Sequence, residues 1–402
     1  MKEGWTTKRL GDVVKRLTNG YVGPTRDIYL EGGIPYLLAR HVKDNELDFD
    51  GRTFVSAAFN EKHKKSKLKS GDVLLVQSGH IGHSAVVTDA HEGHNCHAMI
   101  VISPVVEKLS GPFLSFYFNS PQTRREFDGI RSGSTVPHLT CGAVKEMRIP
   151  VPPLAEQQRI VGVLDEAFAG LAVAQANAAK NLQNARAIFE SHLQAVFSQR
   201  GKGWVETTLG KATGGVFTGP FGSLLHKSDY VENGIPLVNP AHITDTGINP
   251  DFSKTVSKET AKRLENYNMS QGDIVIGRRG EMGRCAVVTD VENGWVCGTG
   301  SFFIKPSERC DPRFLVRLLR SPLCRASLEK LAGGAVMPNL SNTAIAGLSI
   351  SLPPIKRQRE VVEEFEALAV ETQHLSRIYE QKQAQLVALK KSFLHQAFNG
   401  DL

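Results

Sequence analysis

The sequence repeats itself at an interval of 201 residues, which is half of its length of 402. The segment GDVLLVQSGHIGHSAVVTD at 71–89 returns as GDIVIGRRGEMGRCAVVTD at 272–290 without a gap. The segment IPVPPLAEQQRIV at 149–161 returns as ISLPPIKRQREVV at 350–362 with the same offset. Self-similarity at a fixed interval means that one structural unit occurs more than once in the chain. The repeat therefore predicts two copies of one fold, related by a pseudo-twofold axis.

The first 150 or so residues of each copy indicate a mixed domain of the α/β (α+β) class. The run GIPYLLARHV at 33–42 predicts a strand, and the two apolar runs within 71–89, joined by a Gly-rich turn at 78–82, predict a β-hairpin. Residues 96–103 predict a further strand. A helix is expected from Pro112 to about Phe127, with its counterpart from Pro312 to Leu331. A Gly/Ser-rich loop and a last strand then lead into a Pro-Pro pair.

After each Pro-Pro pair the pattern becomes helical for about 45 residues, which would span roughly 67 Å. Apolar positions recur at alternating steps of three and four, which is typical of a coiled coil. Since one helix of this length exceeds a single domain, we expect the two helices to pair as an antiparallel coiled coil. The predicted seam of the first helix is Val161, Leu164, Phe168, Leu171, Gln175, Ala178, Leu182, Ala185, Phe189, His192 and Val196. That of the second is Val361, Phe365, Leu368, Thr372, Leu375, Tyr379, Lys382, Leu386, Leu389 and Phe393.

These patterns divide the chain into four segments: a globular domain at 1–153, a long spacer helix at 154–200, a second globular domain at 201–353 and a second long helix at 354–402. Two similar domains held apart by paired helices suit a repeating partner. Duplex DNA is such a partner, because two-headed readers contact half-sites about one helical turn apart.

Composition agrees with a folded protein that binds a polyanion. The formal net charge is +7, hydrophobic residues make up 41% and charged residues 22%. No unbroken apolar run reaches about 18 residues, so no membrane span is expected. The start of the chain lacks the apolar segment of a signal peptide, and the six scattered cysteines are expected to be reduced thiols of a cytoplasmic protein.

The chain resembles the specificity (S) subunit of Type I restriction-modification systems. The resemblance is carried by the two Pro-Pro-…-Gln helix openings at 149–161 and 350–362. It is also carried by the helix ends FESHLQAVFSQRG and KKSFLHQAFNGDL and by the domain starts GWTTKRLGDV and GWVETTLGKA. It covers essentially the whole chain.

This resemblance implies that each globular domain is a target recognition domain that reads one half of a bipartite site in double-stranded DNA. It implies that the helices set the spacing and dock two methyltransferase (M) subunits, and that restriction (R) subunits complete the assembly. S-adenosylmethionine, ATP and Mg²⁺ would belong to these partner subunits, and this chain would hold no cofactor and catalyse nothing. A two-headed scaffold that binds proteins instead of DNA is the alternative from a different functional class.

Polar and basic side chains on loops are the candidates for contact with DNA, because base edges and phosphates are read by such groups. The hairpin turn differs in its polar residues between the copies, which favours two readers of different sequences but is also compatible with drift on an exposed turn. The loops at 131–139 and 333–340 are compatible with base contact or with a structural role before the next helix. The candidates are Arg40, His41, Lys43, Gln77, Ser78, His80, His83, Arg131, Ser134, His138, Asn239, His242, Arg278, Arg279, Glu281, Arg284 and Asn339. The lysines of 61–70 and the loops at 21–26 and 218–227 are further possible phosphate contacts.

Several catalytic and metal-binding chemistries find no support in the sequence. The stretch HEGHNCH at 91–97 does not follow the HExxH zinc pattern, and its counterpart in the second copy lacks the histidines. There is no Walker A motif. An adenine methyltransferase needs Asn or Asp before Pro-Pro and an aromatic residue after it, whereas this chain has Val-Pro-Pro-Leu and Leu-Pro-Pro-Ile. We therefore expect neither a metal site nor a catalytic site.

Overall fold

The computed structural model describes residues 3–133, 137–199, 201–333 and 339–402. It divides into two compact units, each described here by itself. Unit 1 comprises residues 1–179 and 380–402, and unit 2 comprises residues 180–379. Each unit therefore contains one globular domain, part of the helix that follows this domain, and part of the other long helix.

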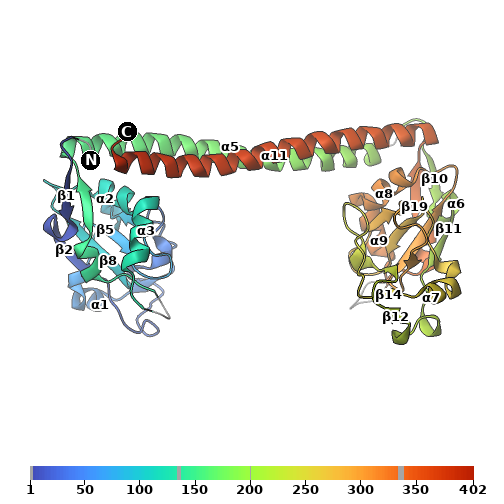
Figure 1. The fold of residues 1–402 in the computed structure, drawn as a ribbon, viewed down its shortest axis with the longest axis horizontal. Helices are drawn as coiled ribbons and strands as arrows, with labels where there is room; N and C mark the ends of the chain where they lie inside the picture. Colours follow the sequence, from blue (N-terminus) through green and yellow to red (C-terminus); the bar gives the residue numbers. More distant parts are fainter. Residues whose placement is uncertain (1–2, 134–136, 200, 334–338) are drawn as a thin grey trace. The chain divides into compact units, whose positions relative to one another are not determined.

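The globular domain of unit 1 is built from nine short strands and four short helices. Its strands are β1 (Thr6–Arg9), β2 (Val14–Asn19), β3 (Ile34–Leu37), β4 (Phe54–Val55), β5 (Val73–Val76), β6 (Ser84–Val86), β7 (Asn95–Cys96), β8 (Met99–Pro104) and β9 (Arg148–Val151). Its helices are α1 (Ala57–Lys62), α2 (Gly111–Phe118), α3 (Pro121–Ile130) and α4 (Cys141–Glu146), and α5 (Leu154–Ser198) follows. Figure 1 shows α2 and α3 between the strands and the long helices.

Unit 2 repeats this order of elements. Its strands are β10 (Val205–Thr208), β11 (Thr213–Thr218), β12 (Tyr230–Val231), β13 (Ile235–Val238), β14 (Thr255–Val256), β15 (Ile274–Gly277), β16 (Cys285–Val287), β17 (Val296–Cys297), β18 (Ser301–Pro306) and β19 (Ser349–Leu352). Its helices are α6 (Leu209–Ala212), α7 (Lys258–Arg263), α8 (Pro312–Arg320), α9 (Pro322–Leu331), α10 (Asn342–Ala346) and α11 (Ile355–Asn399). The predicted internal repeat is thus confirmed, and within the described residues unit 2 differs chiefly by the extra strand β12.

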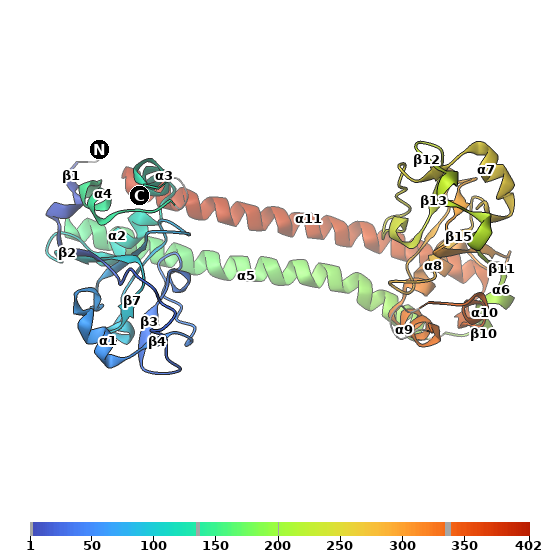
Figure 2. The same cartoon turned by 90° about the horizontal axis from the view of Figure 1, so that it is seen from below.

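Each domain contains a four-stranded antiparallel sheet, in the order β2-β8-β5-β6 in unit 1 and β11-β18-β15-β16 in unit 2. The predicted hairpin of 71–89 is present, because β5 pairs with β6 through Val73 and Val86. A smaller sheet contains β3, which runs parallel to β7 in unit 1, as β13 does to β17 in unit 2. Figure 2 shows β3, β4 and β7 close to α1. Loops that follow β2, β3 and β5 are hydrogen-bonded to neighbouring loops and form the candidate site described below.

Three local predictions were wrong. The strand expected at 96–103 is split into β7 and β8, because Ala98 adopts a φ of 44° where the chain passes from the small sheet to the large one. The helix expected from Pro112 is broken into α2 and α3, and its counterpart into α8 and α9, since Ser120-Pro121 and Ser321-Pro322 begin new helices with the serine as N-cap. The short helices α4 and α10 were not predicted at all.

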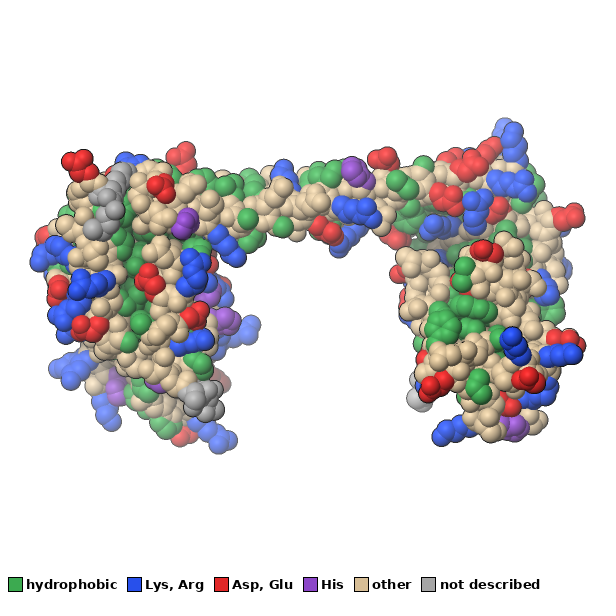
Figure 3. Space-filling model, in the orientation of Figure 1, with side chains coloured by type: hydrophobic (Ala, Val, Ile, Leu, Met, Phe, Trp, Pro, Cys, Tyr) green, Lys and Arg blue, Asp and Glu red, His purple; other side chains and the backbone are tan. Residues whose placement is uncertain are grey.

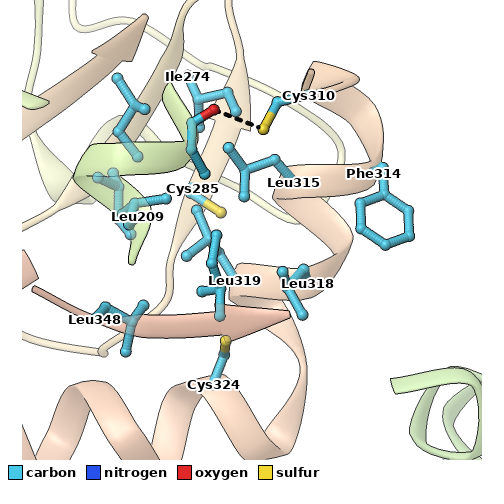
Figure 4. Packing of buried hydrophobic residues seen from close by; sticks show 14 of the residues in the cluster. Leu209, Ile274, Cys285, Cys310, Phe314, Leu315, Leu318, Leu319, Cys324 and Leu348 are labelled. Carbon is cyan, nitrogen blue, oxygen red and sulfur yellow. Dashed lines mark hydrogen bonds between the residues drawn. The ribbon is translucent and has the colours of Figure 1, made fainter. Parts of the chain in front are cut away.

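The core of each unit joins its globular domain to both long helices. In unit 2, leucines of α8 pack with Leu209, Ile274 and Cys285, and the Cys310 thiol donates to the Ala212 carbonyl at 3.1 Å (Figure 4). The ring of Phe365 from α11 lies 5.9 Å from that of Phe189 in α5. In unit 1 the ring of Phe398, near the end of α11, lies 5.3 Å from that of Phe113 in α2. Such burial of large apolar side chains is the main term that holds domain and helices together.

The two long helices are 45 residues each and pair in opposite directions within each unit. Leu164, Leu171, Ala178 and Ala185 are buried at intervals of seven, as a heptad requires. No residue of the seam predicted for α5 is exposed. In α11, by contrast, Lys382 and Leu389 are exposed, and the neighbours Gln383 and Lys390 are half-buried in their place.

The register of α11 was wrong at these positions because a step of three and a step of four are equally compatible with a coiled coil. The apolar Leu389 was the natural choice over a lysine. In the structure the stem of Lys390 lies along the seam and its ammonium lies 4.9 Å from the centre of the Phe168 ring, so a cation–π contact takes the place of apolar packing.

A buried glutamine fixes the start of each long helix to its domain. Gln157 is fully buried, and its carbonyl oxygen accepts from the Ser110 N–H at 2.8 Å. Its amide donates to the carbonyls of Lys108 at 2.9 Å and Pro152 at 2.8 Å. Gln358 makes the same three bonds in unit 2, accepting from Asp311 N–H and donating to Arg309 and Pro353. The Pro-Pro-…-Gln motif is therefore a structural clamp between domain and helix.

One helix, Leu154–Ser198, contains an 18-residue window with a mean hydropathy of 1.2, of which 17% is buried. By length and composition alone such a helix could cross a membrane, which corrects the expectation that no segment would qualify. Because helices of soluble proteins pass the same test, this finding is weak evidence for a membrane span. The six cysteines are all free.

Candidate nucleic-acid interface

The hairpin turn and the loop after α3, predicted as separate candidates, form one site in each unit. In unit 1 the Leu139 N–H donates to the Gln77 carbonyl at 2.8 Å, and His138 forms an isolated β-bridge with Ser78. In unit 2 the Leu340 N–H donates to the Arg278 carbonyl at 2.8 Å, and Asn339 bridges to Arg279. The predicted Ser134 lies outside the described residues. His138 and Asn339 therefore stand directly beside the turn.

The loops that follow β2 and β3 reach the same edge of the domain. The His97 N–H donates to Leu37 at 2.9 Å, and the Ala98 N–H donates to Tyr21 at 3.0 Å. In unit 2 the Gly298 N–H donates to Val238 at 2.9 Å, and Asn239 Oδ1 accepts from the Gly300 N–H at 3.1 Å. Four loops thus meet where the strands end, and such loop clusters on a rigid sheet are where binding sites are commonly found.

The glycines of the GTG sequence at 298–300 allow these loops to pack closely together. A Cβ atom added to Gly298 would lie 2.4 Å from Asn239 Oδ1, and one added to Gly219 would lie 2.0 Å from the Gly298 carbonyl oxygen. Only glycine permits so close an approach of neighbouring loops. The sequence is thus explained by packing and not by nucleotide binding.

The predicted residues that the structure describes differ in their exposure to solvent. Seven are exposed: Arg40, Lys43, His80, Arg131, Arg279, Glu281 and Asn339. Seven are half-buried: Ser78, His83, His138, Asn239, His242, Arg278 and Arg284. Two, His41 and Gln77, are buried.

His41 holds its own loop and does not face solvent. The ring is 1% exposed, its Nδ1 accepts from the Leu38 N–H at 3.0 Å, and its Nε2 lies 3.1 Å from Asp50 Oδ1. Burial lowers the pKa of this imidazole. His242 occupies the equivalent position in unit 2, where its Nδ1 lies 2.8 Å from the Leu237 carbonyl. A pair of histidines chosen as base readers is thus placed by the structure as supports of the loop.

Charged groups fix the hairpin turn from the side in both units. In unit 1, Asp44 lies 2.9 Å from His83 Nδ1 and also pairs with Arg124 of α3. In unit 2 the carboxylate belongs to the turn itself. Glu281 of the turn pairs with Arg284 and, at 3.2 Å, with Arg325 of α9. Sequence reasoning missed Asp44, Arg124 and Arg325. The repeat contained a signal for two of them, since Arg124 and Arg325 stand 201 residues apart.

Arg278 of the unit 2 site is held by two side-chain contacts. Its Nε donates to Asn339 Oδ1 at 3.0 Å, and its guanidinium carbon lies 5.2 Å from the centre of the Phe302 ring. A guanidinium held in this way is preorganised for a bidentate contact, since arginine suits the major-groove edge of guanine and asparagine that of adenine. The arrangement is chemically fit to read bases.

The lysines predicted as phosphate contacts line a groove beside this edge in unit 1. Lys62, Lys64 and Lys65 lie with Tyr21 around a groove of about 310 Å³. The Tyr21 ring lies 4.7 Å from that of His63. In unit 2, Arg263 of α7 matches Lys62 at the 201-residue offset and pairs with Asp229 at 2.8 Å.

Within the described parts of the chain no group of three His, Cys, Asp or Glu side chains could hold a metal ion. The rings of His91 and His94, from the stretch that suggested zinc, lie 5.7 Å apart between centres. Burial lowers the pKa of both imidazoles.

Comparison with known proteins finds one family and several relatives. The family described as Type I restriction modification DNA specificity domain matches residues 2–179 and 214–383. A relative from Methanocaldococcus jannaschii, the Type I restriction enzyme MjaVIII specificity subunit, is 22% identical over 100% of this chain and 93% of its own length. The StySPI specificity subunit of Salmonella potsdam is 23% identical over 100% of this chain and 90% of its own length.

Solved structures resemble the fold over the whole chain. The HsdS subunit from Thermoanaerobacter tengcongensis matches with a TM-score of 0.67 and 20% identity, covering 100% of this chain and 98% of that one. A chain from a study of assembly and conformational transition of the type I R-M system matches with a TM-score of 0.72 and 20% identity, covering 100% and 99%. The two-copy architecture described above is therefore one that solved proteins adopt.

Proposed function

The chain belongs to the family of Type I restriction-modification DNA specificity domains, and from this membership we propose that each of its globular domains reads one half of a bipartite site in duplex DNA. The observation that carries the proposal is the site itself. In both units an equivalent backbone hydrogen bond joins the hairpin turn to the loop that follows α3 in unit 1 and α9 in unit 2. The side chains beside this bond differ, with Ser78 and His138 in unit 1 and Arg279 and Asn339 in unit 2. The same backbone arrangement with different polar side chains is what two half-sites of different sequence require.

Net charge supports the same proposal. Residues 1–153 carry 20 Lys and Arg against 16 Asp and Glu, and residues 201–353 carry 17 against 14. The two helical segments contain equal numbers of cations and anions, so the whole excess of +7 belongs to the globular domains. A positive domain surface favours DNA phosphates.

A domain exchange tests this function. Residues 203–352 are replaced by the matching segment of another specificity subunit, the chimera is produced with its methyltransferase partners, and the methylated motif is read by sequencing. We expect one half of the motif to change and the other half to stay. Exchange of residues 4–151 should change the opposite half. A change in both halves from either exchange would contradict the two-reader proposal.

We further propose that the helices set the gap between the half-sites and dock two M subunits, with R subunits completing the complex. Apolar side chains on the outer faces of α5 and α11 support docking, since Val173, Val370 and Val387 are 62%, 66% and 48% exposed. Figure 3 shows hydrophobic side chains along the surface of these helices. Exposed apolar surface of this kind commonly marks an interface.

Insertion of one heptad into each helix tests the spacing role. Seven residues lengthen a helix by about 10 Å and keep the seam in register, which corresponds to about three base pairs. We expect the unread gap in the methylated motif to grow by about that number. An unchanged gap would show that the helices do not set the spacing.

The proposal assigns catalysis, S-adenosylmethionine, ATP and Mg²⁺ to the partner subunits. In its support, the Pro-Pro pairs lack the polar and aromatic neighbours of an adenine methyltransferase motif. The Pro-Pro pairs also have a structural role, since the carbonyls of Pro152 and Pro353 accept hydrogen bonds from Gln157 and Gln358. Methyl transfer by the purified chain alone would contradict this assignment.

A further inference from the structure

A groove of about 440 Å³ in unit 1 lies where α3 of the globular domain meets the last turns of α11. Its charged lining is strongly basic: the cations Arg124, Arg125, Lys390 and Lys391 face a single carboxylate, Asp44. Arg124 pairs with Asp44. In the part of the chain that the structure describes, no ion pair of Arg125, Lys390 or Lys391 is found. With four cations and one carboxylate, the lining has an excess of three positive charges.

The groove is connected to the candidate DNA interface through Asp44. The same carboxylate that pairs with Arg124 also lies 2.9 Å from His83 of the hairpin turn. Asp44 therefore borders both the groove and the turn, so a duplex held at this turn lies next to the groove.

Unit 2 contains the same groove with a different charge. It has a volume of about 630 Å³ and lies at positions shifted by 201 residues. Lys390 and Lys391 are replaced there by Phe189 and Glu190. The charged lining is balanced, with three cations and three carboxylates: Arg317, Arg320, Arg325, Glu190, Asp245 and Glu281. Two of these pairs are direct, between Arg320 and Asp245 at 3.3 Å and between Arg325 and Glu281 at 3.2 Å.

We propose that the unit 1 groove binds backbone phosphates of the DNA duplex and that the unit 2 groove does not, so that sequence-independent affinity comes unequally from the two domains. This inference rests on the proposed function, because it needs a duplex at the adjacent turn. Like charges that surround a groove without counter-ions repel one another, and a bound phosphate removes this repulsion. Arg125 and Lys391 are exposed and carry the contact, while Lys390 also packs on Phe168.

The test uses the full chain and a random-sequence duplex of 30 base pairs, because phosphate contacts alone support non-specific binding. The double variant Arg125→Gln/Lys391→Gln is compared with the wild type by measuring Kd between 50 and 200 mM salt. Each phosphate contact contributes about 0.9 to the slope of log K against log salt, so two contacts correspond to about 12-fold over this range. We expect the wild type to lose about 12-fold more affinity than the variant.

A matched control removes one arginine and one lysine charge outside the groove. Arg377→Gln/Lys382→Gln neutralises one arginine and one lysine that are exposed on α11 and do not line the groove. This control should keep the wild-type slope. If it changes the slope as much as the groove variant does, the groove has no special role and the inference is wrong.

The remaining outcomes separate this inference from the proposed function. If the wild type shows no salt-dependent binding to duplex at all, the proposed function itself fails. If the wild type binds and the groove variant keeps the full slope, only the groove inference fails. The groove would then face an acidic surface of a protein partner.

Discussion

The clamp glutamines give the sharpest test of how the domains are held on their helices. Gln157→Leu keeps the approximate shape of the side chain and removes three hydrogen bonds. It leaves the Ser110 N–H and the carbonyls of Lys108 and Pro152 without this partner. The glutamine side chain is fully buried, and Pro152 is buried with it.

The expected cost follows from these three groups. A hydrogen bond of this kind contributes about 1 kcal/mol net to stability, so the loss of three bonds costs about 3 kcal/mol. This corresponds to an increase of about 150-fold in the population of the open state. Gln157→Glu should be at least as damaging, because a carboxylate oxygen would then face two carbonyl oxygens.

Hydrogen exchange measured by mass spectrometry reads this effect locally. We expect protection in α2 and in the first turns of α5 to fall by about two orders of magnitude in Gln157→Leu, while unit 2 serves as an internal reference. Gln358→Leu should produce the same loss in α8 and α11. The control is Gln158→Leu, which makes the same substitution at the adjacent exposed position. Equal protection in Gln157→Leu and Gln158→Leu would show that the three bonds do not hold the domain on its helix.

Two further predictions concern the domain frame. Burial lowers the pKa of His41, His91, His94 and His97, all in unit 1. As pH falls through 6.5 the unfolded chain therefore takes up protons before the folded one, and the free energy of unfolding of unit 1 should fall between pH 7 and 5.5. Hydrogen exchange at the two pH values, corrected for intrinsic rates, checks this, and an equal or larger change in unit 2 would contradict it. Gly82→Ala should destabilise unit 1 by about 1–3 kcal/mol in urea unfolding, because Gly82 has a φ of 91° and an added Cβ would lie 2.9 Å from Phe127. Gly79→Ala is the control, with a φ of 74° and open space around the Cβ, and an equal loss in both variants would show that the contact with Phe127 is unimportant.

The elements that sequence patterns predicted well are those fixed by local periodicity. The hairpin at 71–89 is bounded by glycines that adopt positive φ, and the long helices contain no proline after their first turn. The breaks at Ser120-Pro121 and at Ala98 were harder. The break at Ser120-Pro121 could be predicted only by recognising the serine as the N-cap of a new helix. The break at Ala98 arises because the chain passes there from the small sheet to the large one, which no local sequence pattern indicates.

Whether the candidate residues contact DNA stays a prediction, and the contacts among them could not be predicted from the sequence. The turn and the loop at 131–139 were both identified, yet nothing local shows that Leu139 donates to Gln77. His41 looked like a reader because histidine is polar. It is buried where its own loop folds back, with the Phe49 ring 5.2 Å away and the Asp48 N–H donating to the His41 carbonyl at 2.8 Å. Distances of this kind are set by tertiary packing, which periodicity and residue type do not determine.

Comparison of the two copies distinguishes residues that maintain the fold from residues that could determine recognition. Residues shared at the 201-residue offset do structural work: Gln157 and Gln358 clamp the helices, Gly82 and Gly283 close the turns, and His41 and His242 hold the loops. Residues that differ at the same offset lie at the tips, where Ser78 is matched by Arg279 and His138 by Asn339. Both copies keep the same backbone while facing different half-sites. A position at which the two copies differ is therefore one where the fold permits substitution, and such a substitution is free to alter recognition. The grooves beside α11 follow the same rule, since the backbone is retained and only the charge is changed.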